Sequence, residues 1–229
     1  MNPIIKILIF ADFFVFSGLG LINPIFAVFI KEDLRGATLA SVGMAATIFL
    51  VVKAVLQIPI ARFTDREPAS LREFWTLVVG QGIIAIVPFL YLLIDSVGEL
   101  YGVQALYGLG AALAFPGFMA IFTKFGDHEK AAFSWSLHST VVLLSMAAAA
   151  GIGGYVGQHY GFRVLLVGVG ALTFLGFFTT LGLALFYREL SNEKLKAGGS
   201  FWKRLASALR RSKQPPPPPA ALAGTSVPK

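Results

Sequence analysis

Charged side chains are rare inside the long apolar stretches of this chain, and two of them could do chemistry. Asp12 lies about eight residues into the first stretch, and Lys53 lies about eight residues from the end of the second, which runs the other way. At a rise of about 1.5 Å per residue both would lie ~12 Å deep, so an ion pair between the two helices is geometrically possible. An unpaired charge at that depth costs at least ~2.5–3.5 kcal/mol.

The Asp12–Lys53 pair has two interpretations. In the functional one, Asp12 accepts a proton or contacts a cationic substrate, and Lys53 is its counter-charge. In the structural one, the two side chains form a static pair that fixes the helix register, or Lys53 extends toward the membrane surface. In each case the sequence predicts a polar position within an apolar bundle.

Three further polar residues could belong to the same site. Asn23 follows Asp12 by eleven residues, about three helical turns, and so shares its face. Its neighbour Pro24 removes a backbone donor, which makes this segment either a flexible cavity wall or an ordinary kink satisfied by neighbouring helices. Gln104 and Tyr107 are the polar candidates of the fourth stretch.

Other chemistry lacks the residues that it needs. His138 lies one turn inside the fifth stretch and either relays protons or is simply hydrogen-bonded. No metal-ligand cluster, Ser/His/Asp set, paired carboxylates or phosphate-binding loop stands out, so we expect no enzyme, no cofactor and no metal site. Cysteine is absent, which excludes disulfides and thiolate ligands.

The elements that must position these residues are six apolar stretches. They cover residues 4–30, 38–61, 75–94, 100–123, 134–157 and 164–187. Each reaches the ~20 residues that cross ~30 Å of hydrocarbon. The chain is 56% hydrophobic and 14% charged, whereas soluble domains carry roughly 25% charged residues. The sequence therefore predicts an all-α integral membrane domain of six transmembrane helices over residues 1–187.

The Lys and Arg residues between the stretches predict an orientation. One side would hold Lys6, Arg62, Arg66, Arg72, Lys124, Lys130 and the basic tail, and the other only Lys31, Arg35 and Arg163. Because positive loops stay cytoplasmic, we expect a multi-pass protein of a bacterial plasma (inner) membrane with both termini inside.

The segment after the sixth stretch is basic. Residues 188–213 should form a cytoplasmic amphipathic segment, and the Pro-rich residues 214–229 should be disordered. Nine of the nineteen Lys and Arg residues follow residue 187. This location beside a membrane span indicates contact with anionic lipids and no nucleic-acid partner.

The same short sequence pattern occurs in the first and the fourth apolar stretch, which begin the two halves of the six-stretch region. Gly18 and Gly20 precede Pro24 in the first stretch, as Gly108 and Gly110 precede Pro116 in the fourth. Two glycines followed by a proline loosen a helix, and the same pattern at corresponding places of two segments is typical of inverted repeats. Small residues here, and at Gly153 and Gly154 of the fifth stretch, predict close helix packing or a surface that slides during transport.

Four motifs, on the expected sides, are similar to those of one family. They are residues 18–24 of the first stretch; 61–66, similar to G-x-x-x-D-R; 104–112, similar to R-x-x-x-G-x-G-A-A; and 149–163, similar to the antiporter motif and its Gly-Trp-Arg ending. Residues 4–187 thereby resemble the N-terminal half of the Major Facilitator Superfamily, in its drug:proton antiporter branch.

The resemblance carries expectations about individual residues. It implies that Asp65, with Arg66 and Arg72, closes a cytoplasmic gate, although Pro68, Ala69 and Ser70 replace the Gly and basic pair of that motif. Gln104 stands where the family has an arginine associated with proton transfer, and a neutral amide cannot supply that charge.

The resemblance also implies a function. It predicts a 3+3 inverted repeat, and a half-sized transporter that works by alternating access on a small cationic or amphipathic solute. Its partner would be a second copy or another half-transporter. Alternatively, the chain is a non-transporting structural or assembly subunit of a larger membrane complex, or a truncated product without function.

Overall fold

The computed structural model describes residues 2–66, 71–126 and 128–184, which belong to one compact unit. The basic segment predicted over 188–213, the Pro-rich tail over 214–229 and loop residues 67–70 lie outside the described residues.

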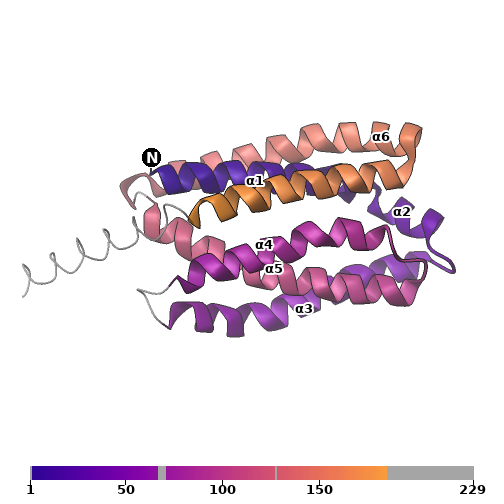
Figure 1. Ribbon diagram of the computed structural model, residues 1–229, viewed down its shortest axis with the longest axis horizontal. Coiled ribbons are helices and arrows are strands. Elements are labelled where there is room, and N and C mark those ends of the chain that lie inside the picture. Colours follow the sequence, from indigo (N-terminus) through magenta and orange to yellow (C-terminus); the bar gives the residue numbers. More distant parts are fainter. Residues whose placement is uncertain (1, 67–70, 127, 185–229) are drawn as a thin grey trace, which may run out of the picture. The chain divides into compact units, whose positions relative to one another are not determined.

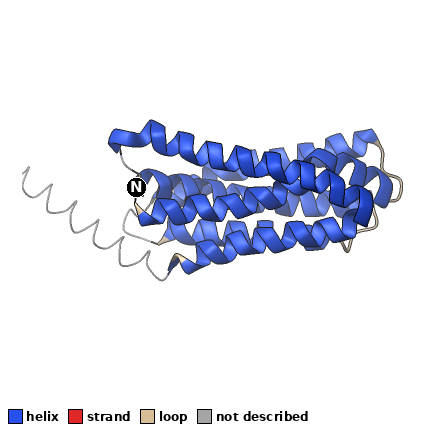
Figure 2. Ribbon diagram, turned by 90° about the horizontal axis from the view of Figure 1, so that it is seen from above, coloured by secondary structure: helices blue, strands red, loops and turns tan. Residues whose placement is uncertain are grey.

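The described part is all-helical, as predicted (Figures 1 and 2). Its elements are α1 (Pro3–Ile22), η1 (Asn23–Ile25), α2 (Phe26–Asp33), α3 (Leu39–Asp65), α4 (Arg72–Tyr91), α5 (Val97–Phe125), η2 (His128–Lys130) and α6 (Ala131–Gly182). Five helices or helix runs are long and apolar enough to cross a membrane, the first comprising α1, η1 and α2. The polar breaks between them are short.

Polar caps fix where helices begin. Ser41 N donates to Thr38 Oγ1 at 3.2 Å and Thr38 N donates back to Ser41 Oγ, so two otherwise unsatisfied donors at the start of α3 are paired. Ser96 and Glu99 repeat this box at the start of α5. The turn before Ser96 corrects one predicted boundary, because α4 ends at Tyr91 and not at residue 94.

Gly161 divides the 52 residues of α6 into two arms. A straight helix of that length would measure ~78 Å, more than twice the ~30 Å hydrocarbon core. Gly161 has φ 80° and ψ 166°, a conformation open to glycine because it lacks a Cβ. Figure 1 shows the first arm, residues 131–160, turning back into the second, residues 162–182.

The two prolines of the repeated sequence pattern, Pro24 and Pro116, have different effects on their helices. At Pro24 the α-helix gives way to the 3-10 turn η1, as the missing N–H predicts. Pro116 leaves α5 continuous, so the loosening predicted there is wrong. At the next residue α4 lies close to α5, since a Cβ on Gly117 would lie 2.5 Å from the carbonyl oxygen of Glu73. Close packing of α4 holds α5 in place at this point.

α1 packs against both arms of α6. A Cβ on Gly18 would lie 2.9 Å from the carbonyl oxygen of Val169 in the second arm, and one on Gly20 would lie 2.8 Å from the Cα of Met146 in the first. Since real Cβ atoms do not approach so closely, both contacts need glycine. The same contact from the other side involves Gly153, whose Cβ would overlap the carbonyl oxygen of Leu21.

α5 packs against α3 and α4 in the same manner. A Cβ on Gly108 would lie 2.7 Å from the carbonyl oxygen of Phe49 in α3, and one on Gly110 would lie 2.8 Å from Cγ2 of Ile83 in α4. Close packing was also predicted for Gly154, but there a Cβ would meet nothing within 4 Å among the described residues. One residue after Gly153 is about 100° around the helix, so Gly154 faces away from α1.

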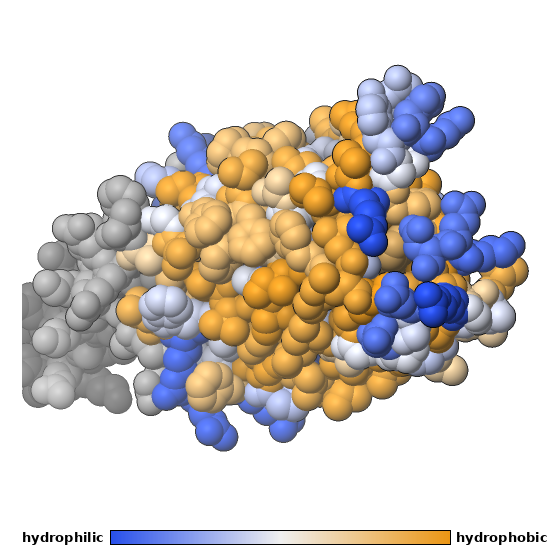
Figure 3. Space-filling view, turned by 45° about the vertical axis from the view of Figure 1, so that its right-hand side comes forward, coloured by the Kyte–Doolittle hydropathy of each residue, from blue (hydrophilic) through white to orange (hydrophobic). Residues whose placement is uncertain are grey.

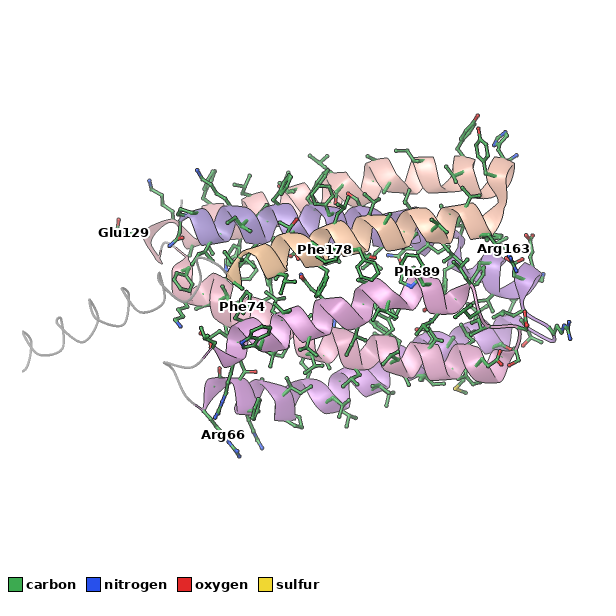
Figure 4. The ribbon with its side chains drawn as sticks, viewed as in Figure 1. Arg66, Phe74, Phe89, Glu129, Arg163 and Phe178 are labelled. Atoms are coloured by element: carbon green, nitrogen blue, oxygen red, sulfur yellow. The ribbon has the colours of Figure 1, made fainter. Side chains whose placement is uncertain are left out.

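The surface of the described residues is apolar along the helices and polar at the ends. Figure 3 shows, on the face it presents, a broad hydrophobic band with hydrophilic residues gathered mainly at one end. α3 is the most exposed of the long helices. Arg66 and Glu129 lie at the opposite end of the bundle from Arg163 (Figure 4). This is the surface of an integral membrane domain.

Candidate functional site

A cavity of about 340 Å³ lies among α1, α3, α4, α5 and the first arm of α6. Five residues singled out from the sequence line it: Asp12, Asn23, Lys53, Tyr107 and His138. Most of the remaining wall is apolar and aromatic. The tertiary fold therefore gathers polar groups from separate helices around one space, which is the usual form of a small-molecule site.

Asp12 pairs with His138 and not with Lys53. Asp12 Oδ2 lies 2.8 Å from His138 Nε2, and the side chains are 9% and 14% exposed. With an ionised carboxylate, Nε2–H is the donor. The ion pair with Lys53 proposed from the sequence does not form, because α1 packs against α6 while α3 packs against α5.

His138 is held by aromatic rings as well as by the carboxylate. The ring centroids of Phe118, Phe122 and Trp135 lie 5.0, 5.7 and 6.0 Å from that of the imidazole. These rings pack around the imidazole. The pair can bind or release a proton within the cavity wall, which is chemistry that the sequence offered for Asp12 and His138 separately.

Lys53 reaches the same cavity from α3. Its Nζ lies 5.3 Å from the centroid of the Phe115 ring, a distance suited to a cation–π contact. Within the described part of the chain it has no carboxylate partner. Lys53 is half-buried, so its charge is only partly compensated by protein and faces the cavity space.

Gln81 is a cavity residue that the sequence analysis missed. It comes from α4, is 4% exposed, and its Oε1 is buried without a hydrogen-bond partner among the described residues. Buried polar atoms are nearly always paired, so this one is a marker of function or of bound solvent. The available signal was a strongly polar side chain in the middle of an apolar stretch.

Gln104 lies beside a second, smaller space. Together with Asn23 and Tyr107 it lines a cavity of about 60 Å³, while it does not line the larger one. Gln104 itself is buried at 4% exposure. Asn23 and Tyr107 thus line both cavities, whereas Gln104 lines the smaller cavity and not the larger one.

The predicted gate residues lie at the end of the bundle, away from the cavity lining. Asp65 ends α3 and is exposed, Arg66 caps it, and the guanidinium of Arg72 lies 4.9 Å from the Phe63 ring centroid. Among the described residues Asp65 makes no ion pair.

Among the described residues, an ion pair at this end joins two other side chains. Lys124 Nζ of α5 lies 2.7 Å from Glu73 Oε1 of α4, and the Glu73 side chain is 7% exposed. This pair links α4 to α5 at the end of the bundle where Arg66 lies. The sequence analysis did not anticipate it, because fifty-one residues separate the partners.

Comparison with known proteins decides the family. The family model described as Major Facilitator Superfamily matches residues 8–225. The chain belongs to the Major Facilitator Superfamily. The resemblance drawn from the four motifs is therefore confirmed, and so is the class of membrane transport proteins to which it pointed.

Curated relatives of this facilitator chain include the Quinolone resistance protein NorA of Staphylococcus aureus, in strains Mu50 and N315. Each is 23% identical over 183 residues, which cover 80% of this chain and 45% of the relative. The facilitator chain thus spans less than half the length of the curated relatives that it matches.

Proposed function

We propose that this chain forms one six-helix half of a facilitator-type transporter, which moves a small amphipathic solute across the membrane by alternating access. The observation that carries the proposal is the cavity of about 340 Å³, where Asp12, Lys53, Gln81 and His138 meet inside an otherwise apolar bundle. Ionisable groups inside a membrane domain are expensive, and they generally mark a substrate or proton pathway.

The helix contacts support a 3+3 inverted repeat, with each arm of α6 counted as one span. The first triplet is then α1, α3 and α4, and the second is α5 and the two arms. α1 contacts both arms of α6, just as α5 contacts both α3 and α4. If the two triplets are interchanged, the contacts of α1 with the α6 arms become the contacts of α5 with α3 and α4. A two-fold axis in the membrane plane requires this correspondence.

A second six-helix unit would complete the transport path, as a second copy of this chain or as another half. α3 and the first arm of α6 both contribute to the cavity wall, and both expose large apolar side chains such as Leu50 and Leu144. A two-fold axis along the membrane normal would place α3 of one unit against the α6 arm of the other.

The Asp12–His138 pair is our candidate for coupling transport to protons. The sequence-based interpretation of Asp12 as a proton acceptor rested on Lys53, whereas His138 is the closer partner. Protonating the carboxylate would weaken its bond to the imidazole and change the charge of the cavity.

Transport by reconstituted protein tests this function. Vesicles containing the full chain should accumulate amphipathic fluorescent solutes, including a quinolone, above protein-free vesicles, and a pH gradient should increase the rate. Asp12→Asn keeps the shape of the side chain and removes its titration, so we expect the effect of the gradient to fall about tenfold or more. Normal transport and normal proton coupling in Asp12→Asn would remove Asp12 from the mechanism.

The structural-subunit alternative predicts a different result. Uptake that never exceeds protein-free vesicles over the whole panel, together with stoichiometric co-purification with a larger membrane complex, would contradict the transporter and favour an assembly role.

A further inference from the structure

We propose that the cavity selects aromatic solutes that carry an anionic group, with Lys53 binding the anion and the Gln81 amide binding a second polar group of the solute. The proposal rests on the transport function above and names the solute class. Of the cationic or amphipathic solutes that the sequence analysis left open, it departs from the cationic ones.

The charges that line the cavity argue against a cation. Asp12, Lys53 and His138 are the charged or titratable groups that face it, from α1, α3 and α6, with Tyr107 of α5 as a neutral phenol. With Asp12 ionised and Lys53 charged, the total is zero if His138 is neutral and +1 if it is protonated. Protonating Asp12 raises the total further. The described lining is therefore never net negative while Lys53 is charged.

The positions of the charges sharpen this argument. The Asp12 carboxylate is already occupied by His138 at 2.8 Å, so a cationic solute would have to displace the imidazole to reach it. Among the described residues, the contact of the Lys53 ammonium is the Phe115 ring face, 5.3 Å from its Nζ. An ammonium carries three N–H donors, and an aromatic face does not satisfy them. A carboxylate would satisfy these donors through charge-assisted hydrogen bonds.

Gln81 supplies an independent sign of a ligand. Its Oε1 is buried and unpartnered among the described residues, and the side chain lines the cavity from α4. A buried acceptor of this kind gains free energy when a donor arrives. A hydroxyl or N–H group on the solute would provide that donor.

The remaining wall suits a flat aromatic body. Phe16, Phe49, Phe115, Phe118 and Trp135 all line the cavity, and aromatic faces and edges favour stacked or edge-on rings. The volume of about 340 Å³ lies at the lower end of the range for small-molecule pockets, roughly 300–1,000 Å³. A bicyclic aromatic acid combines the required size, faces and charge.

Two matched probes test the charge preference. Radiolabelled 2-naphthoate and 2-naphthylmethylammonium share a ring system and differ in charge, and their equilibrium binding to the full chain in lipid nanodiscs is measured directly. We expect naphthoate to bind about tenfold more tightly than the amine. Lys53→Gln should weaken naphthoate binding about tenfold and leave amine binding unchanged or stronger.

Control variants separate the site from general effects of charge. Lys31→Gln removes an exposed cation at the end of α2, outside the cavity lining, and should leave both affinities unchanged. For Gln81 the probe is 6-hydroxy-2-naphthoate, whose hydroxyl can donate. Its advantage over naphthoate should be present in the unmodified chain and lost in Gln81→Leu.

Two results would overturn the proposal: tighter binding of the amine, or a Lys53→Gln variant whose naphthoate affinity matches that of Lys31→Gln. If vesicle uptake of other solutes persists in either case, the transporter survives and only the anion preference fails. Charge-selective naphthoate binding without any vesicle uptake would support the site and contradict the transport function.

Discussion

At the residue scale, the Asp12–His138 pair is the feature that most changes the chemistry expected of this chain. Depth along the helices suggested Lys53 as the partner of Asp12, and depth alone could not distinguish α3 from α6 as the neighbour of α1. With His138 at 2.8 Å, the carboxylate already has a hydrogen-bond partner inside the bundle. Lys53 is thereby left to face the cavity.

Replacing one member of the Asp12–His138 pair should lower the free energy of unfolding more than replacing both members. In His138→Leu the Asp12 carboxylate, at 6% residue exposure, loses its donor, and we expect a loss of about 3–5 kcal/mol in the free energy of unfolding. The measurement is reversible unfolding in mixed detergent micelles.

The matched control is the double variant Asp12→Leu/His138→Leu, which buries no charge and should recover most of the loss. A His138→Leu variant as stable as the unmodified chain, or a double variant less stable than His138→Leu, would contradict the predicted cost of leaving the Asp12 carboxylate buried without its donor.

At the element scale, glycines decide how closely the helices approach. In lipid the apolar effect does not draw helices together, so close backbone packing must supply the contact energy. Gly18, Gly20 and Gly153 serve the contacts of α1 with α6, and Gly108 and Gly110 serve those of α5 with α3 and α4. These contacts set the cavity walls on both sides.

Two adjacent glycines give a clean comparison of packing with helix propensity. Gly153→Ala would place a methyl group against the Leu21 carbonyl and push α1 from the first arm of α6, at an expected cost of about 1–3 kcal/mol. Gly154→Ala meets open space, and should be neutral or stabilise by up to about 1 kcal/mol.

Thermal unfolding of both glycine variants in detergent provides the test. Equal effects at the two positions would mean that the Gly153–Leu21 approach does not limit packing.

At the scale of the whole molecule, the two ends of the bundle should lie on opposite sides of the membrane. The chain contains no cysteine, so single cysteines report their own accessibility. We expect Arg163→Cys to react with an impermeant maleimide in intact cells, and Arg66→Cys only after permeabilisation, because the Arg66 end carries more Lys and Arg.

Glu129→Cys lies at the same end as Arg66 and must follow its labelling, while the cysteine-free chain must stay unlabelled. Labelling of Arg66→Cys from outside would reverse the predicted orientation.

Pairing of two units makes a second prediction at this scale. Leu50 of α3 and Leu144 of the α6 arm are both exposed, and the proposed two-fold axis along the membrane normal would bring them together across an interface between two units. Co-expressed Leu50→Cys and Leu144→Cys chains with different tags should form a mixed disulfide.

Phe178→Cys is the control for this cross-link, because Phe178 is an exposed residue of the second arm, which contributes no residue to the cavity lining. Cross-linking of Leu144→Cys to Phe178→Cys in place of Leu50→Cys would contradict the proposed pairing.

The sequence by itself determined the class of the protein and selected several of the residues that line its cavity, because both depend on properties local to the chain. Apolar length and scarce charge predict membrane helices, and ordered motifs predicted the family that residues 8–225 match. Asp12, Asn23, Lys53 and Tyr107 could be selected because polar groups in lipid need a reason to be there.

Only the tertiary structure decided which of those groups meet. Asp12 pairs with His138 and not with Lys53 because α1 packs against α6. That helix contact depends on glycines that lie more than a hundred residues from their partners in the sequence, as Gly20 does from Met146. Gln81 likewise became informative only when its amide oxygen was found buried and unpaired. Helix length follows from local composition, whereas partners follow from packing between distant segments.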